Sequence, residues 1–193
     1  MIKVVPDILA FLTVGSDVFL AAVVVFFILE KLAAGKLYSR LAKYFSSRAY
    51  FLSFVVSLTA TLGSLYFSEI AKFTPCLLCW YQRILMYPQA LLLYISILRD
   101  EKILIPYLRI FNIIGAAIAG YHYYIQVSPR SSFLPCSVGG QVSCTKTYTL
   151  YFGYITIPMM ALTAFLLNLV LLHLAAARHR SQRSGAGRLL KKG

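Results

Sequence analysis

The sequence predicts an all-α polytopic membrane protein with five spanning helices, and three observations support this fold class. Hydrophobic residues make up 60% of the 193 residues and charged residues only 13%, whereas soluble domains are about 45–50% apolar and about 25% charged. Five segments are about as long and as apolar as a spanning helix requires. Most Lys and Arg residues lie between those segments or after the last one.

The first apolar segment, residues 8–29, is predicted to be a retained transmembrane helix. The alternative is a cleaved signal peptide, but only Lys3 supplies positive charge before the apolar run. Asp17 falls inside this segment, and an intramembrane carboxylate is a functional candidate by default. Because Thr13 and Ser16 are near it in the sequence, we favour a structural role for Asp17, facing the helix bundle.

The other four predicted spans are residues 50–71, 80–98, 103–126 and 150–174. The third span of the chain is the shortest and contains Pro88, which is tolerated where neighbouring groups satisfy the freed carbonyl. The fourth contains the stretch IIGAAIAG, whose small residues allow close approach of another helix.

The distribution of basic residues predicts the orientation in the membrane. Of the 19 Lys and Arg residues, 13 lie in three segments: 31–48, 99–102 and 178–192. Cytoplasmic loops carry the excess of Lys and Arg, so we expect these segments to be cytoplasmic. The N-terminus, the 72–79 turn and the 127–149 loop are then extracytoplasmic.

Three regions follow from this pattern. Residues 1–49 are an N-terminal helix with a basic cytoplasmic linker, residues 50–174 are the core, and residues 175–193 are a basic cytoplasmic tail. Its stretch RHRSQRSGAGRLLKKG, residues 178–193, is expected to be disordered. The net charge of +13 indicates cytoplasmic loops and contact with anionic membrane lipid. We therefore expect no nucleic-acid partner, and we expect a monomer in the cell membrane.

All four cysteines lie in the two predicted outer segments. Cys76 and Cys79 form a CxxC motif, while Cys136 and Cys144 lie in the second outer loop. An even number of extracytoplasmic cysteines indicates disulfide chemistry, and CxxC recurs in redox motifs. Two structural disulfides are the alternative. A four-cysteine zinc site is a weaker alternative, because the cysteines of the second pair are widely spaced. We therefore expect no metal.

The stretch CLLCWYQR places a dithiol and a charge at the edge of the membrane. Pro75 disfavours helix at Thr74, so a new helix is expected to start near Cys79. The N-terminus of a helix stabilises a thiolate, and Arg83, four residues later, would share a face with Cys79. Alternatively, Arg83 only extends its charge to the interface.

The order of these motifs resembles the DsbB/BdbC family of quinone-dependent, disulfide-generating membrane proteins. CLLCWYQR is followed by a proline-containing helix, a YHYY helix end, a loop with paired cysteines, and FGYITIPMMAL. The resemblance covers residues 50–174 and implies a four-helix bundle core. Residues 1–49 lie outside it and add one extra N-terminal transmembrane helix.

The resemblance implies a relay of disulfide exchange. Cys136–Cys144 would oxidise a thioredoxin-fold protein of the DsbA/BdbD type, with Cys136 taking the partner. Cys76–Cys79 would then reoxidise the loop pair. Exchange proceeds by thiolate attack through mixed disulfides.

The resemblance also implies a cofactor, a membrane quinone (menaquinone or ubiquinone). Cys79 would attack or stack on the quinone and Arg83 would polarise it. His122, near the outer end of the fourth span, is a candidate proton donor to the reduced quinone, because histidine titrates near physiological pH. A structural interfacial histidine is the alternative.

Two other functions remain open from the sequence. Vitamin K epoxide reductase-like enzymes also use four cysteines and a quinone, but their loop cysteines precede the CxxC motif, whereas here they follow it. The other is a non-enzymatic membrane scaffold with structural disulfides. Oxidation of a dithiol only in the presence of quinone would exclude the scaffold.

Overall fold

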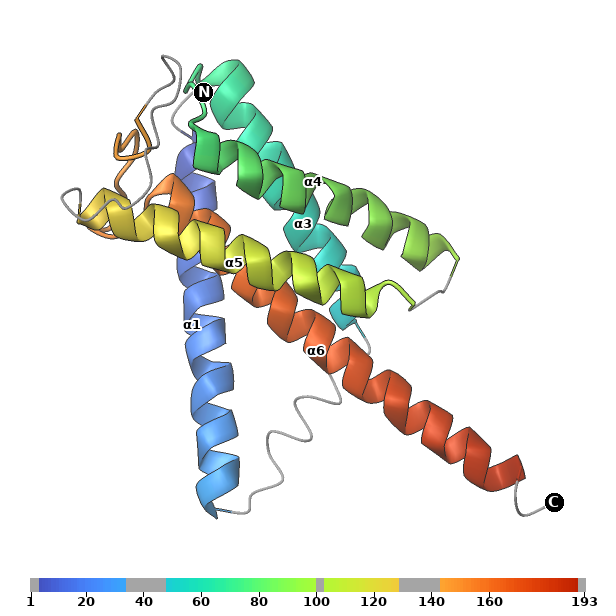
Figure 1. Ribbon diagram of the computed structural model, residues 1–193. Helices are drawn as coiled ribbons and strands as arrows, with labels where there is room; N and C mark the ends of the chain where they lie inside the picture. Colours follow the sequence, from blue (N-terminus) through green and yellow to red (C-terminus); the bar gives the residue numbers. More distant parts are fainter. Residues whose placement is uncertain (1–3, 34–47, 100–102, 129–142, 191–193) are drawn as a thin grey trace.

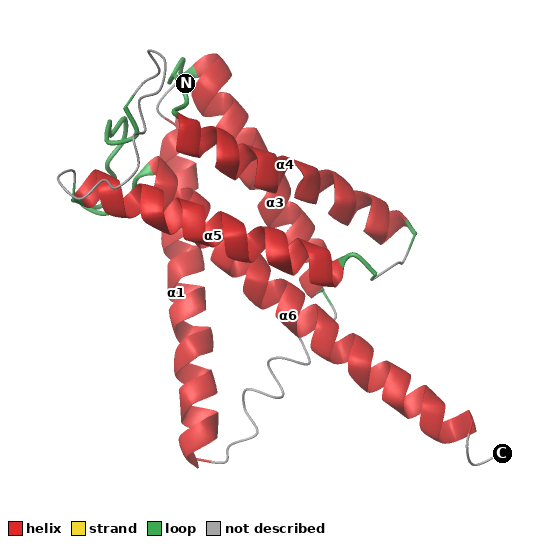
Figure 2. Ribbon diagram, viewed as in Figure 1, coloured by secondary structure: helices red, strands yellow, loops and turns green. Residues whose placement is uncertain are grey.

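The computed structural model describes residues 4–33, 48–99, 103–128 and 143–190. In these ranges the regular structure is helical, apart from one isolated bridge between Tyr151 and Ile155. Figures 1 and 2 show the arrangement. The elements are α1 (Val4–Ala33), α3 (Ala49–Leu65), the π-helical turn η1 (Tyr66–Ile70), α4 (Leu77–Leu98), α5 (Ile105–Val127) and α6 (Ile157–Leu190).

Helices α3, α4, α5 and α6 form the bundle, and α1 packs against α6 and α3 (Figure 1). Within the described residues, three helical stretches are long and apolar enough to cross a membrane: Val4–Val25, Ala49–Ile70 and Ile157–Ala176. Polar side chains lower the hydropathy of α4 and α5, but many of them, such as Gln89 and Asn112, are buried inside the bundle. The predicted all-α membrane fold is confirmed.

Hydrogen bonds between buried amides and hydroxyls join the helices in pairs. The Asn112 amide donates to Gln89 Oε1 at 2.7 Å and joins α5 to α4. Asn168 on α6 donates to Ser57 Oγ at 2.9 Å and accepts from Ser53 Oγ at 2.8 Å, both on α3. Such interhelical bonds stabilise bundles in lipid, where water offers no alternative partner.

The predicted close packing at IIGAAIAG is confirmed at Gly115. A β-carbon there would lie 2.3 Å from Cε1 of Phe165 on α6. Only glycine therefore allows this approach of α5 and α6. Phe165 is fully buried, in a cluster with Met86 and Ala119.

The predicted start of the fifth span, at residue 150, was wrong. Residues 150–156 form a turn in which Tyr151 and Ile155 exchange backbone hydrogen bonds of 2.9 Å. Phe152 (φ 51°) and Gly153 (φ 79°) have left-handed conformations, and helix α6 begins only at Ile157. The stretch is apolar enough to be taken for helix, because hydropathy does not distinguish a turn from a span.

The prediction of a disordered tail was also wrong over residues 178–190. Helix α6 continues without interruption to Leu190 and extends beyond the bundle in Figure 1. Its Ala, Arg, Gln and Leu residues are good helix formers, and positive charge is favourable towards the C-terminus of a helix. A charged composition was therefore a poor indicator of disorder here.

Asp17 joins α1 to the bundle. Thr163 Oγ1 donates to Asp17 Oδ1 at 2.7 Å, and the Tyr154 hydroxyl donates to Asp17 Oδ2 at 3.3 Å. Thr13 and Ser16, the neighbours considered above, instead donate to carbonyls of their own helix. The carboxylate faces the bundle as predicted.

Candidate redox site

The CxxC motif lies at the break between η1 and α4. Pro75 precedes the helix as predicted, and Cys76 is the N-cap residue, with an extended backbone (φ −80°, ψ 176°). The first helical hydrogen bond runs from the Trp80 N–H to the Cys76 carbonyl at 3.2 Å. Cys79 is thus the third residue of α4, where unpaired N–H groups and the helix dipole favour a thiolate.

The two thiols of the motif are not equivalent. The Cys76 thiol donates a hydrogen bond to the Cys79 sulfur, with 3.3 Å between the sulfurs. This bond, together with burial, raises the pKa of Cys76, which precedes α4, from 9.0 to about 12. Cys76 therefore keeps its proton, and the bond that it donates stabilises negative charge on Cys79.

Arg83 is held in a fixed position one turn after Cys79. Its Nε donates to Ser64 Oγ at 2.9 Å and its Nη2 donates to the Ser64 carbonyl at 3.0 Å. The Tyr87 hydroxyl also donates to Ser64 Oγ at 3.2 Å, and the guanidinium lies 5.3 Å from the centre of the Trp80 ring. This pose differs from that of an arginine that only extends towards the interface.

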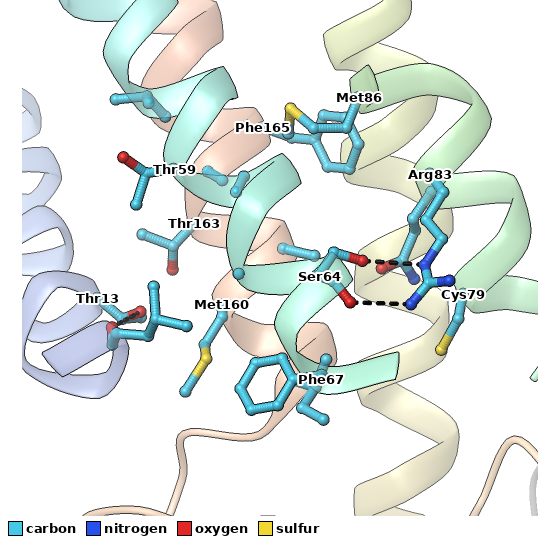
Figure 3. Close-up of a pocket in the computed structure, with 18 of the residues that line it drawn as sticks. Thr13, Thr59, Ser64, Phe67, Cys79, Arg83, Met86, Met160, Thr163 and Phe165 are labelled. Atoms are coloured by element: carbon cyan, nitrogen blue, oxygen red, sulfur yellow. Dashed lines mark hydrogen bonds between the residues drawn. The ribbon is translucent and has the colours of Figure 1, made fainter. Parts of the chain in front are cut away.

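A cavity of about 280 Å³ begins beside Cys79 and Arg83. Figure 3 shows these two side chains next to each other, opposite Phe67 and Met160. The other walls come from α1, α3, α4 and α6, and most of the lining side chains are apolar. Ligand cavities typically combine an apolar lining with a few placed polar groups, and this one has a thiol and a guanidinium at one end.

His122 lies on the other side of the motif, on α5. Its Nε2 is 3.2 Å from the Cys144 carbonyl oxygen. Because a carbonyl only accepts, Nε2 carries the proton, and Nδ1 then accepts from the Gln82 amide at 3.0 Å. Nε2 is also 3.6 Å from the Cys76 sulfur. His122 is not among the residues that line the cavity beside Arg83, and it lies instead against Cys76 and the Cys144 carbonyl.

The segment that precedes α6 brings Cys144 to the CxxC motif. Cys144 is 1% exposed and packs in one cluster with Cys76 and Cys79. Residues 143–149 are anchored to the segment before α4, because the Tyr148 hydroxyl donates to the Thr74 carbonyl at 3.1 Å. Cys136, the other predicted loop cysteine, lies outside the described residues.

The comparisons with known proteins agree with this arrangement. The family model described as "Disulfide bond formation protein DsbB" matches residues 46–175. The chain belongs to the DsbB family. Family membership makes it a membrane thiol:disulfide oxidoreductase and confirms the predicted resemblance. Helix α1 and most of the linker lie outside the matched residues.

Curated relatives carry the same kind of name. The chain is 50% identical over 121 residues to "Disulfide bond formation protein C" of Bacillus subtilis, covering 62% of this chain and 86% of the relative. It is 47% identical over 116 residues to "Probable disulfide formation protein C" of Halalkalibacterium halodurans, covering 60% of this chain and 83% of the relative. No solved structure matches the chain.

The sequence did not single out three of the residues that shape the site. Ser64 fixes Arg83, the buried Gln82 fixes His122, and Tyr148 anchors the outer loop. Gln82 could have been found from the sequence, because a polar side chain inside a predicted membrane span needs a hydrogen-bond partner. Ser64 and Tyr148 lie among similar residues and carried none.

The site also contains three potential metal ligands. The sulfurs of Cys76 and Cys79 and a nitrogen of His122 all lie within 4.8 Å of one another. In the structure these atoms are already engaged, in the Cys76–Cys79 bond and the bond from His122 to the Cys144 carbonyl. Together with the family membership, this favours thiol exchange over metal binding.

Proposed function

We propose that the chain oxidises an extracytoplasmic thioredoxin-fold partner of the DsbA/BdbD type and passes the electrons to membrane quinone. The observation that carries the proposal is the position of the CxxC motif between two different surroundings. Cys79 lines an apolar cavity next to Arg83, while Cys76 packs against Cys144 and His122. This arrangement supports a lipid-soluble acceptor at Cys79 and exchange with a protein thiol at Cys76.

The cavity fits a quinone, either menaquinone or ubiquinone. Its lining is mostly apolar, as a hydrophobic ring requires, and the Arg83 guanidinium supplies fixed donors for a ring carbonyl. A quinone bound there would accept the two electrons and two protons released when the Cys76 and Cys79 thiols become a disulfide. Arg83 would hold the carbonyl, and the stabilised Cys79 thiolate would face the ring.

The protein's own cysteines carry the exchange with the partner. A thiolate of the partner attacks Cys136, the Cys136–Cys144 bond breaks, and Cys144 leaves with the electron pair. The partner's second thiol then releases Cys136, so the partner holds a disulfide and the loop pair holds two thiols.

The loop pair is reoxidised at the CxxC motif. Cys144 as a thiolate attacks the Cys76 sulfur of the Cys76–Cys79 disulfide, and Cys79 leaves as a thiolate. Attack of Cys136 on Cys144 then restores the loop disulfide and releases Cys76 as a thiol. The burial of Cys144 in one cluster with Cys76 supports this step, and the N–H of His122 can stabilise charge on Cys76.

The proposal places the redox cysteines on the extracytoplasmic face of the cell membrane and the C-terminus in the cytoplasm. The basic residues of the linkers support this orientation. Reporter fusions at residues 3 and 190 test it, and we expect the first outside and the second inside. Finding both on one side would contradict the five-span topology.

An anaerobic reconstitution tests the function. The purified chain in lipid is mixed with a reduced thioredoxin-fold oxidase and a defined quinone, and both partner disulfide and quinol are measured. We expect one disulfide for each quinol, and no partner oxidation without quinone. The Cys79→Ser variant is the matched control. Partner oxidation that needs no quinone would contradict the proposal, and no oxidation at all would favour the scaffold.

A further inference from the structure

The extra N-terminal helix forms one wall of the cavity. Leu9, Leu12, Thr13 and Ser16 of α1 all line it, and Figure 3 shows Thr13 beside Met160 and Thr163 of α6. Helix α1 lies outside the residues that match the DsbB family, 46–175. The cavity is therefore bounded in part by a helix that the family core lacks.

Two contacts fix the position of α1 against this core. Leu9 packs on Gly63 so closely that a β-carbon on Gly63 would lie 2.9 Å from Leu9 Cδ1. Gly63 directly precedes Ser64, which holds Arg83. Eight residues further along α1, Asp17 accepts the hydrogen bond from Thr163. The contacts thus bracket the stretch of α1 that lines the cavity.

The wall that α1 contributes is apolar in character. The Thr13 hydroxyl donates to the Leu9 carbonyl and the Ser16 hydroxyl donates to the Leu12 carbonyl, each at 2.8 Å. Because these protons are used within the helix, neither hydroxyl has one to offer a ligand in the cavity. The polar end of the cavity is instead at Cys79 and Arg83, on α4.

We propose that this face of α1 binds the isoprenoid chain of the quinone, while the ring lies at the Arg83 end. The inference rests on the proposed function and adds a part of the site that the family core does not supply. In lipid, close van der Waals packing against apolar side chains is what favours binding of such a chain, and the donors that a ring carbonyl needs are on α4. Helix α1 would then give the enzyme a preference for quinones that carry a side chain.

Quinone binding can be measured directly because Trp80 is the only tryptophan of the chain. Its ring lies 5.3 Å from the Arg83 guanidinium, so a quinone at that end of the cavity is expected to quench its fluorescence. The probes are 2-methyl-1,4-naphthoquinone, which has no side chain, and the same ring with four isoprenoid units. The apparent affinity for each quinone is compared between variants in the same detergent. Partition of that quinone into micelles then affects all variants equally.

The decisive variant is Leu12→Ala, with Ile8→Ala as its matched control. Leu12 and Ile8 lie on the same helix with nearly equal exposure, 53% and 52%, but only Leu12 lines the cavity. We expect Leu12→Ala to weaken binding of the prenylated quinone by about tenfold, with no change for the unprenylated one. Ile8→Ala should change neither. Arg83→Ala should weaken both.

A second variant tests the position of the helix. Thr163→Val keeps the shape of the side chain but removes the donor to Asp17, so α1 should dock less firmly. We expect the same selective loss of prenylated quinone. Unchanged binding of both quinones in Leu12→Ala would overturn the inference alone, and an equal loss of both would overturn the assignment of α1 to the side chain. Failure of both quinones to quench the unsubstituted protein would overturn the proposed function as well.

Discussion

The two sulfurs of the CxxC motif, three residues apart, lie in contrasting surroundings. Cys79 lines an apolar cavity next to a guanidinium fixed by Ser64. Cys76 is buried beside Cys144 and a histidine that is hydrogen-bonded on both ring nitrogens. Under the proposed function, this difference would let one dithiol serve an acceptor dissolved in lipid and a donor dissolved in water.

The contrast arises from where the helix begins. Cys76 is the N-cap with an extended backbone, and Cys79 lies within the first turn. The bond between the two sulfurs leaves the proton on Cys76 and favours charge on Cys79. A helix that began three residues later, at Trp80, would make Cys79 the N-cap and remove this difference.

The largest expected effect on activity comes from removing one sulfur on each side of the motif: Cys79, which faces the cavity, or Cys144, which packs near Cys76. Cys79→Ser should abolish quinone reduction by any dithiol, because the sulfur that faces the cavity is lost. Cys144→Ala should abolish oxidation of the protein partner but leave oxidation of small dithiols partly active, since the CxxC motif remains. Quinol formation with each donor measures both. Full partner oxidation by Cys144→Ala would mean that the loop pair is only structural.

The second prediction concerns the pH dependence of the two thiols in the reduced protein. A thiolate reacts with alkylating agents and a thiol does not. Raising the pKa of Cys76 from 9.0 to about 12 lowers its thiolate fraction near neutral pH about a thousandfold. We expect Cys79 to be alkylated first at pH 7, and Cys76 to react increasingly as the pH rises towards about 12. Mass spectrometry of each site measures this, and equal rates at pH 7 would remove the proposed asymmetry.

The third prediction concerns only the cavity side. Arg83→Ala should weaken the apparent quinone affinity about 10- to 100-fold, because hydrogen bonds to a charged group contribute about 1.5–3 kcal/mol. Arg83→Lys should be intermediate, since an ammonium lacks the planar fork of donors. The measurement is turnover against quinone concentration, with thiol trapping as a control for the CxxC state. If turnover depends on quinone concentration in the same way in both variants, Arg83 does not bind the quinone and is only an interfacial charge.

The smallest expected effect is on the other side, at His122. His122→Ala should slow partner oxidation about tenfold, the equivalent of about 1.4 kcal/mol, which is a typical single hydrogen bond. The dependence on quinone concentration should not change, because His122 does not line the large cavity. His122→Gln, which keeps a donor for the Cys144 carbonyl, should recover part of the rate. A shift in quinone dependence instead would support the quinone-side role expected from the family resemblance.

The sequence by itself determined the fold class and the chemistry of the site. Apolar segments separated by basic linkers predict membrane helices, because the cost of placing charge in lipid acts on every residue locally. Pro75 precedes the start of α4 at the CxxC motif, and the spacing of four placed Arg83 beside Cys79. These are effects between residues that are near each other in the chain, so a local pattern contains them.

Only the tertiary structure decided what each sulfur faces. His122 reaches Cys76 across 46 residues, and Thr163 reaches Asp17 across 146. Helical periodicity says which face of a helix is apolar, but not which helix covers that face or at what height. The cavity wall from α1, the Ser64 support of Arg83 and the turn at residues 150–156 were therefore decided by packing between helices, which local sequence patterns do not encode.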